Sequence, residues 1–436
     1  MESDNKKTVN LDGYSIFDYT KNWYLVPTYL LTNYVPKRVK PGPLYEGLIL
    51  TNEEQFSETD IEKINSFILI TDFDKILQNL FEPFVYPIKI KNGTRVKHFS
   101  NTIWLAEKVE LLKPLNFWEV ILQTADIYSG TIDIECQSYL PNNLKLPSIV
   151  KGSLTFFDSK LPCDIQLPDS VEETILIQFC EIPPTWQFPK KMKSLILENC
   201  TFYENIDFNK ISLTNVEIFN CNYPSIIPFP DFFSGTLSID IGIISSEFRF
   251  PKCIGNLFLG DLTLNKGAKL PEKVNHNLTF IKVVMPEAIK LPNYCKEFSA
   301  IECNFSKGII LPIKGLNEIE MIACTLPQEL TIPDVPNLKL SFMSMIIPAG
   351  IKIGKEFNGS LEFTNCEFTK GFKLPAKIIG SLTIAGYKFN GLLKLPKNGD
   401  YDFCIRESDD ISNFDIPDSI KSKIIILPTV DDSGEF

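Results

Sequence analysis

The stretch LPEKVNHNLTFIKVVMPEAIKLP, residues 270–292, begins and ends on a Leu-Pro dipeptide. The same step, an apolar residue followed by proline, returns about every 21 residues between residues 146 and 417. A fixed period of this length is typical of a solenoid, in which each repeat packs only on its neighbours. The steps are Leu146-Pro147, Leu167-Pro168, Phe188-Pro189, Phe229-Pro230, Phe250-Pro251, Leu270-Pro271, Leu291-Pro292, Leu311-Pro312, Ile332-Pro333, Leu374-Pro375, Leu395-Pro396 and Ile416-Pro417.

Each repeat contains two short segments in which apolar and variable residues alternate. One segment ends at the proline step, as in Ile289-Lys290-Leu291, and the other follows about eight residues after such a step, as in Leu278-Thr279-Phe280. Alternation predicts a strand with one buried face, and proline ends the first strand because it cannot donate to a ladder. We therefore expect a mainly β fold, a parallel β-solenoid of about fourteen repeats of strand, proline corner, strand and loop.

A small residue, often cysteine, stands three positions after the second strand's last apolar residue, which produces the pattern L-x-L-x-x-C. This pattern resembles the strand segment of a leucine-rich repeat, and residues 270–285 resemble the Leu-Pro repeats of bacterial effector proteins. Residues 374–396 are also similar to the FNIP repeat of amoebae and their giant viruses. The resemblance implies a leucine-rich-repeat-like solenoid and a viral or amoebal protein. A straight parallel β-helix is the alternative to a leucine-rich horseshoe.

Residues 1–128 do not keep the 21-residue period, so we expect them to form an N-terminal capping or accessory domain of mixed α/β structure. Residues 60–64 and 74–80 have the apolar spacing of helices. The solenoid is expected to span residues 129–428, and residues 429–436 are expected to be a solvated C-terminal tail.

Composition narrows the classes of function. The net charge of -11 offers no general affinity for nucleic acid or an anionic membrane, and no apolar stretch is long enough to insert into a bilayer. The odd number of cysteines, eleven, and their place in the repeat favour reduced, buried thiols over a disulfide framework. Zinc needs cysteine pairs that converge, so we expect no metal and no cofactor. These features predict a cytoplasmic protein, or one of the host cytosol or the virion if it is viral.

The chain contains no recognisable catalytic motif. Its two histidines, His98 and His276, lie outside any known motif, and the outward carboxylates Glu217, Glu320 and Glu362 are well separated by repeat count. We therefore expect a non-enzymatic scaffold for protein–protein interaction on the outer faces of the solenoid. The alternatives are a structural component of a large assembly, such as a virus particle, and a β-helix carbohydrate-active enzyme.

The variable residue in the middle of the first strand must point outward, and in many repeats it is a cation. Arg249, Lys269 and Lys290 form one run, and Lys352, Lys373 and Lys394 form a second. Like charges on neighbouring strands repel, so a partner with an acidic surface or phosphate groups would relieve them. This hypothesis makes the six residues a partner-binding face; the alternative is that lysines only keep the sheet soluble. The oligomeric state is left open.

The second strand also carries charged residues on its outward side. In three successive repeats we expect Glu320, Lys339 and Glu362 at its centre.

Overall fold

The computed structural model describes residues 126–135, 144–158, 161–203, 206–224, 227–389 and 391–428, together with eight backbone strands before residue 126. The early strands pair antiparallel, for example β1 with β4 and β5 with β6. The predicted helices at 60–64 and 74–80 and the tail at 429–436 lie outside the described residues. The eight strands are β1 (Trp23–Leu25), β2 (Leu44–Glu46), β3 (Leu69–Ile70), β4 (Phe84–Lys89), β5 (Val96–Ser100), β6 (Ile103–Ala106), β7 (Lys108–Leu111) and β8 (Leu115–Asn116).

The chain divides into two compact units, Met1–Lys193 and Ser194–Phe436, called here the N-terminal and the C-terminal unit. Both contain stacked turns of parallel strands, about 14 turns of roughly 21 residues in total. With 49% strand and 3% helix, the fold is mainly β, and the predicted parallel β-solenoid is confirmed.

In the N-terminal unit the parallel pairing includes β9 (Ile127–Tyr128), so it starts two residues before the boundary predicted from the period. The longer strands of this unit pair in strict register, so that Leu154 stands opposite Ile175 and Phe156 opposite Ile177. The parallel strands of this unit are β9, β10 (Ile132–Glu135), β11 (Ile149–Val150), β12 (Leu154–Phe157), β13 (Ser170–Val171) and β14 (Thr174–Gln178).

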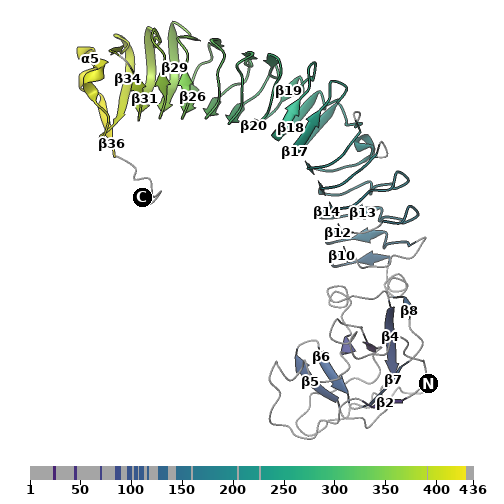
Figure 1. Cartoon of the computed structure of the whole chain (residues 1–436). Helices are drawn as coiled ribbons and strands as arrows, with labels where there is room; N and C mark the ends of the chain where they lie inside the picture. The colour runs from purple at the N-terminus through teal and green to yellow at the C-terminus, as the bar shows by residue number, and fades with distance from the viewer. Residues whose placement is uncertain are drawn as a thin grey trace, which may run out of the picture. The chain divides into compact units, whose positions relative to one another are not determined.

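In the C-terminal unit the second strand of each predicted repeat forms one continuous parallel sheet. Figure 1 shows β17, β18, β20, β26, β29, β31 and β34 stacked side by side. These long strands are β15 (Ser194–Glu198), β16 (Asn215–Phe219), β17 (Phe232–Ile244), β18 (Cys253–Leu264), β20 (Asn277–Ile281), β22 (Glu297–Ile301), β24 (Glu318–Ile322), β26 (Leu338–Met343), β29 (Glu356–Thr364), β31 (Lys377–Ala385), β34 (Asn398–Arg406) and β36 (Ile424–Leu427).

The first strands of the predicted repeats form short ladders that end at or just before the proline steps, or before Gly354 in the case of β28; we call them proline strands. Their apolar residues point inward: Ile289 and Leu291 are buried, and Pro292 is buried behind them. They contribute the second wall of the core, opposite long-strand residues such as Phe280. The proline strands are β21 (Ile289–Lys290), β23 (Ile309–Ile310), β25 (Glu329–Ile332), β28 (Gly350–Ile353), β33 (Leu393–Lys394) and β35 (Phe414–Asp415).

The loop predicted after the second strand of each repeat contains a third ladder. It is seen as β27 (Ile346–Ile347), β30 (Glu367–Phe368) and β32 (Lys388–Phe389), and elsewhere as isolated parallel bridges such as Asn304 with Thr325. Only one or two residues of each turn pair here, which is too short a stretch for an alternating pattern to appear in the sequence. The remaining elements of the unit are β19 (Lys273–Val274), two short 3-10 turns (Phe208–Lys210 and Ile411–Asn413) and the one-turn helix α5 (Asp418–Lys421).

The register of β26 corrects one detail of the predicted second strand. Ser341, not Lys339, stands opposite Glu320, and Lys339 instead pairs with Glu318 through a 2.6 Å ion pair. The error arises because β26 has three alternating apolar residues, Leu338, Leu340 and Phe342, so the pattern fits two frames.

The predicted inward position of the corner cysteines is confirmed, since five of the six are buried and Cys221 is half-buried. The residue before each of them adopts a left-handed backbone conformation that the sequence did not indicate. This left-handed corner lets the chain leave the long strand and turn inward at once. With φ between 40° and 55°, the non-glycine corner residues are Asp158, Phe179, Asn199, Asn220, Ile241, Asp261, Lys282, Glu302, Ala323, Ser344 and Asn365.

Replacing Ile241 with asparagine is expected to stabilise the C-terminal unit by about 1 kcal/mol, because a β-branched residue is among the least tolerant of this conformation. The Ile241 side chain is already 39% exposed, so the loss of apolar burial is smaller than for a core isoleucine. Urea unfolding followed by circular dichroism measures the change. The matched control is Ile243→Asn, two residues further on and 61% exposed with no left-handed backbone. An equal gain in both variants, or none in Ile241→Asn, would contradict the explanation.

Candidate binding surface

All six cations predicted to face outward are exposed, and all belong to the C-terminal unit. We call Arg249, Lys269, Lys290, Lys352, Lys373 and Lys394 the cation column. The turns that carry them follow one another in register: Lys290 stands opposite Ile310, Thr331 opposite Lys352, and Lys394 opposite Asp415. Ile310 and Thr331 therefore separate the column into two blocks of three cations.

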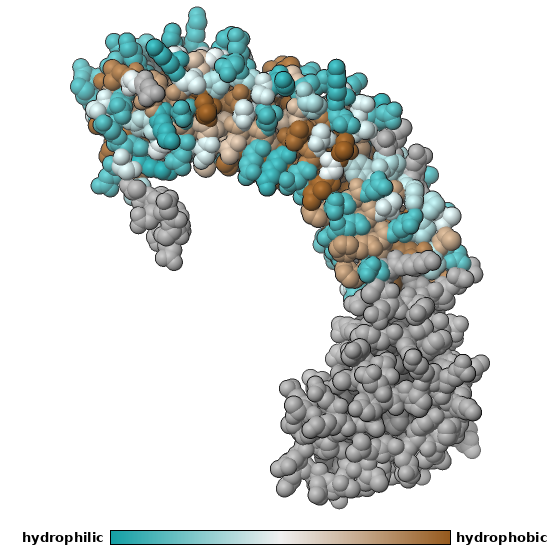
Figure 2. All heavy atoms as spheres, in the orientation of Figure 1, coloured by the Kyte–Doolittle hydropathy of each residue, from teal (hydrophilic) through white to brown (hydrophobic). Residues whose placement is uncertain are grey.

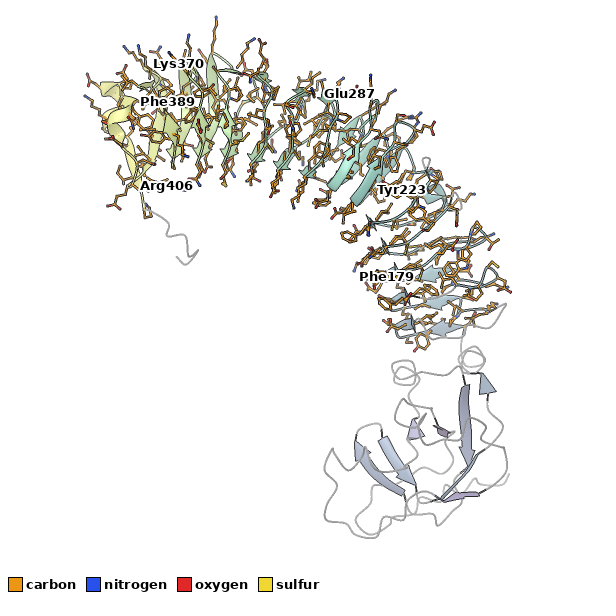
Figure 3. All side chains as sticks on the ribbon, viewed as in Figure 1. Phe179, Tyr223, Glu287, Lys370, Phe389 and Arg406 are labelled. Carbon is orange, nitrogen blue, oxygen red and sulfur yellow. The ribbon has the colours of Figure 1, made fainter. Side chains whose placement is uncertain are left out.

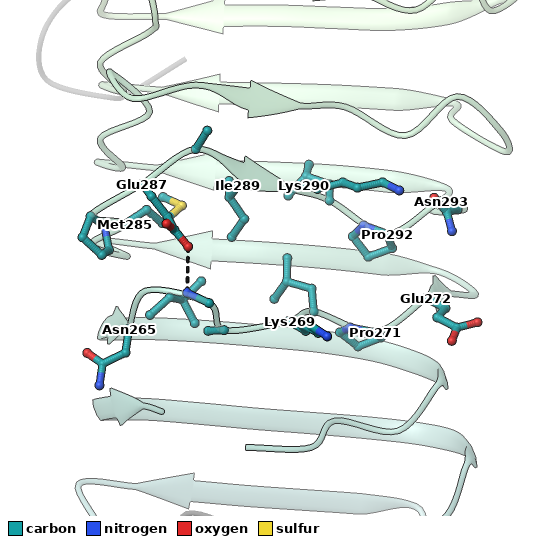
Figure 4. Close-up of a pocket in the computed structure, with 17 residues that line it drawn as sticks. Asn265, Lys269, Pro271, Glu272, Met285, Glu287, Ile289, Lys290, Pro292 and Asn293 are labelled. Carbon is teal, nitrogen blue, oxygen red and sulfur yellow. Dashed lines mark hydrogen bonds between the residues drawn. The ribbon is translucent and has the colours of Figure 1, made fainter. Parts of the chain in front are cut away.

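The first block borders a groove of about 450 Å³ between two successive turns. Lys269 and Lys290 both line it, beside the proline steps Pro271 and Pro292 (Figure 4). At one end the backbone N–H of Gly267 donates a 2.7 Å hydrogen bond to Glu287 Oε1, which ties the two turns together. The groove is therefore lined by apolar residues together with two cations and two carboxylates, Glu272 and Glu287.

The second block carries more positive charge than its three residues of the cation column provide. Each of its three turns has another exposed lysine three residues from the column residue, namely Lys355, Lys370 and Lys397. Figure 3 shows Lys370 on the edge of the stacked turns opposite Arg406. A search for lysine pairs flanking the proline strands at a spacing of three would have found these residues. Figure 2 shows predominantly hydrophilic side chains along the upper edge of these turns.

Few carboxylates neutralise the second block. Lys352 Nζ lies 3.6 Å from Glu329 Oε2, but both side chains are well exposed, so the pair contributes little. Glu356 is engaged by Lys377 at 3.1 Å. Within the described residues Lys373 and Lys394 form no ion pair, although Asp415 is the register neighbour of Lys394. The column therefore keeps positive charge on an acidic protein.

The outward carboxylates do not meet in one place. Glu217 lies on β16, Glu320 on β24 and Glu362 on β29, and each accepts a hydrogen bond from a neighbouring side chain. Among the described side chains no group of three or more His, Cys, Asp or Glu is arranged to hold a metal ion. No helix in the described part of the chain has the length and apolarity needed to cross a bilayer.

Comparison with known proteins adds no family to this picture: no family model matches the chain, and neither the curated proteins nor the solved structures contain a match. The fold and the surface together define a repeat solenoid with a cationic column on one face.

Proposed function

We propose that the chain is a non-enzymatic interaction scaffold, and that the cation column binds an acidic segment of a partner protein. The observation that supports this most directly is the exposure of six cations at the same position of the repeat, in two blocks of three, on a protein of net charge -11. Cations on neighbouring strands about 4.8 Å apart destabilise one another. The carboxylates of an acidic partner would attract these cations and offset their mutual repulsion.

The groove beside Lys269 and Lys290 supports a protein partner. It is lined by apolar residues, including Leu270 and Leu291, by Lys269, Lys290 and the amides of Asn265 and Asn293, and by two carboxylates, of which Glu287 is already engaged by the Gly267 N–H. A peptide can bury an apolar side chain on such a floor while its carboxylates meet the lysines. We therefore expect the partner to bind through both the charge of the cation column and the shape of the groove.

Reversing two charges of the second block is expected to weaken binding of a fluorescein-labelled oligoglutamate peptide by about tenfold or more. Fluorescence anisotropy on the full chain compares wild type with Lys373→Glu/Lys394→Glu at low ionic strength. Rising salt should weaken the wild-type complex, because exposed charges are screened. Circular dichroism should show the same melting temperature for both proteins, since both lysines are exposed.

The matched control is Lys314→Glu/Lys388→Glu, which changes the net charge equally at two exposed lysines outside the column. It should retain most of the binding. Equal losses in the two double variants would show a general charge effect, and unchanged binding in Lys373→Glu/Lys394→Glu would mean that the column only keeps the sheet soluble.

A further inference from the structure

Cys303 and Cys324 occupy the same corner position in two successive turns, those that follow β22 and β24. The backbone N–H of Cys303 points at Cys324 Sγ with a distance of 3.4 Å, and the Thr325 N–H donates to the Cys303 carbonyl at 2.9 Å. The next residues, Asn304 and Thr325, pair as a parallel bridge. The two thiols are therefore held side by side in the solenoid wall, at 2% and 4% exposure.

This arrangement has the backbone spacing of a disulfide. Register neighbours in parallel strands lie about 4.8 Å apart, within the range of about 4.4–6.8 Å that disulfide Cα atoms span. Apart from each other and the Cys303 N–H, the sulfurs contact backbone carbonyls: Cys303 Sγ lies 3.3 Å from Ile301 O, and Cys324 Sγ lies 3.3 Å from Ala300 O and from Ile322 O.

The two thiols are not equivalent. A hydrogen bond from the Cys324 side chain lowers the pKa of Cys303. The same contact, together with burial, raises the pKa of Cys324. Since the thiolate is the reactive form, Cys303 is the nucleophile of the pair and Cys324 the resolving thiol.

We propose that Cys303 and Cys324 form a cross-turn dithiol that a peroxide oxidises to a disulfide. Cys303 loses its proton, the thiolate attacks one oxygen of hydrogen peroxide, the O–O bond breaks, and the released hydroxide takes up the proton that Cys303 lost to become water. The resulting sulfenic acid condenses with the Cys324 thiol, so that the S–S bond forms, the S–O bond breaks and a second water leaves. Two thiols are oxidised and one peroxide is reduced to two waters.

A second pair repeats the geometry and supports the inference. The Cys200 N–H points at Cys221 Sγ with a distance of 3.4 Å, and Thr201 and Asn222 pair as a parallel bridge. Cys366 has the same corner position but stands between Met345 and Tyr387 in the ladder, neither of which has a thiol. Cys366 therefore serves as a control, because an effect that needs a thiol in the neighbouring turn should not occur there.

The test treats the full-length protein with hydrogen peroxide, blocks remaining thiols with iodoacetamide under denaturing conditions, and maps the peptides by mass spectrometry. Wild type and Cys366→Ser should both yield the cross-linked 303–324 peptide, and a dithiol reductant should abolish it. The oxidised protein should melt several degrees higher than the reduced protein, because the bond constrains the unfolded chain. Cys303→Ser should lose this cross-link.

If Cys303→Ser fails to fold, Cys303→Ala supplies the same comparison with an apolar side chain. Recovery of Cys303 and Cys324 as alkylated thiols after peroxide treatment would overturn the proposal. So would their separate conversion to sulfinic acids without a cross-link.

Discussion

Replacing Phe363 with alanine is expected to lower the free energy of unfolding of the C-terminal unit by about 4 kcal/mol. Phe363 is fully buried on β29, and its ring centroid lies 5.6 Å from that of Phe342, 5.1 Å from Phe368 and 5.7 Å from Phe372. Truncation leaves a cavity that connects all three walls of the turn. Neighbouring turns cannot collapse into it, since hydrogen-bonded ladders on both sides hold their spacing.

Urea unfolding by circular dichroism measures the loss, and hydrogen exchange should show it first in peptides of residues 338–385. Phe232→Ala is the matched control, because that side chain is 79% exposed and its removal should change stability by less than about 0.5 kcal/mol. A loss in Phe363→Ala no larger than in Phe232→Ala would show that the aromatic cluster does not stabilise the stack.

Replacing Gly380 with alanine is expected to cost about 3 kcal/mol or to shift the register of β31. Gly380 stands opposite Gly359 with φ of 125°, and an added Cβ would lie 2.2 Å from the Gly359 carbonyl oxygen. That oxygen belongs to the backbone of the preceding turn, so it cannot move without displacing the turn. Thermal melting by circular dichroism and hydrogen exchange of residues 377–385 measure the effect.

Gly371→Ala separates the two causes of this cost. Gly371 also has a positive φ, 97°, but the atom nearest to its added Cβ is 3.7 Å away. It should lose only the backbone preference, about 1 kcal/mol. Equal losses at Gly371 and Gly380 would show that close approach between turns is not the reason for the glycine.

The regular parts of the fold could be predicted because their causes are local. Proline at Pro292 lacks an N–H and ends a strand wherever it stands, and the alternation of Ile289 and Leu291 needs only three residues to appear. Gly380 differs, because it lies within β31 and its steric cause is a carbonyl oxygen of another turn, which no single repeat contains. Only the repeat period indicated that successive turns of the solenoid stack on one another.

The left-handed corner was missed because no residue type marks it. Asn199, Asn220 and Asn365 suit this conformation, but Phe179 and Ile241 adopt it as well. Tertiary context overrides their preference, since the ladder on either side holds the corner. The wrong position predicted for Lys339 has a similar cause. Two alternating frames of the strand fitted the sequence pattern, and only the pairing of β26 with β24 selected one of them.

The sequence by itself determined the period, the two alternating strands, the inward cysteines and the exposed cation column. The period follows from recurrence along the chain, and the other three features follow from residues within one repeat. Only the tertiary structure decided which turns border the groove beside Lys269 and Lys290. It also decided that Cys303 meets Cys324. These are contacts between turns, about 21 residues apart in the chain, and their geometry is set by strand pairing and not by the repeat alone.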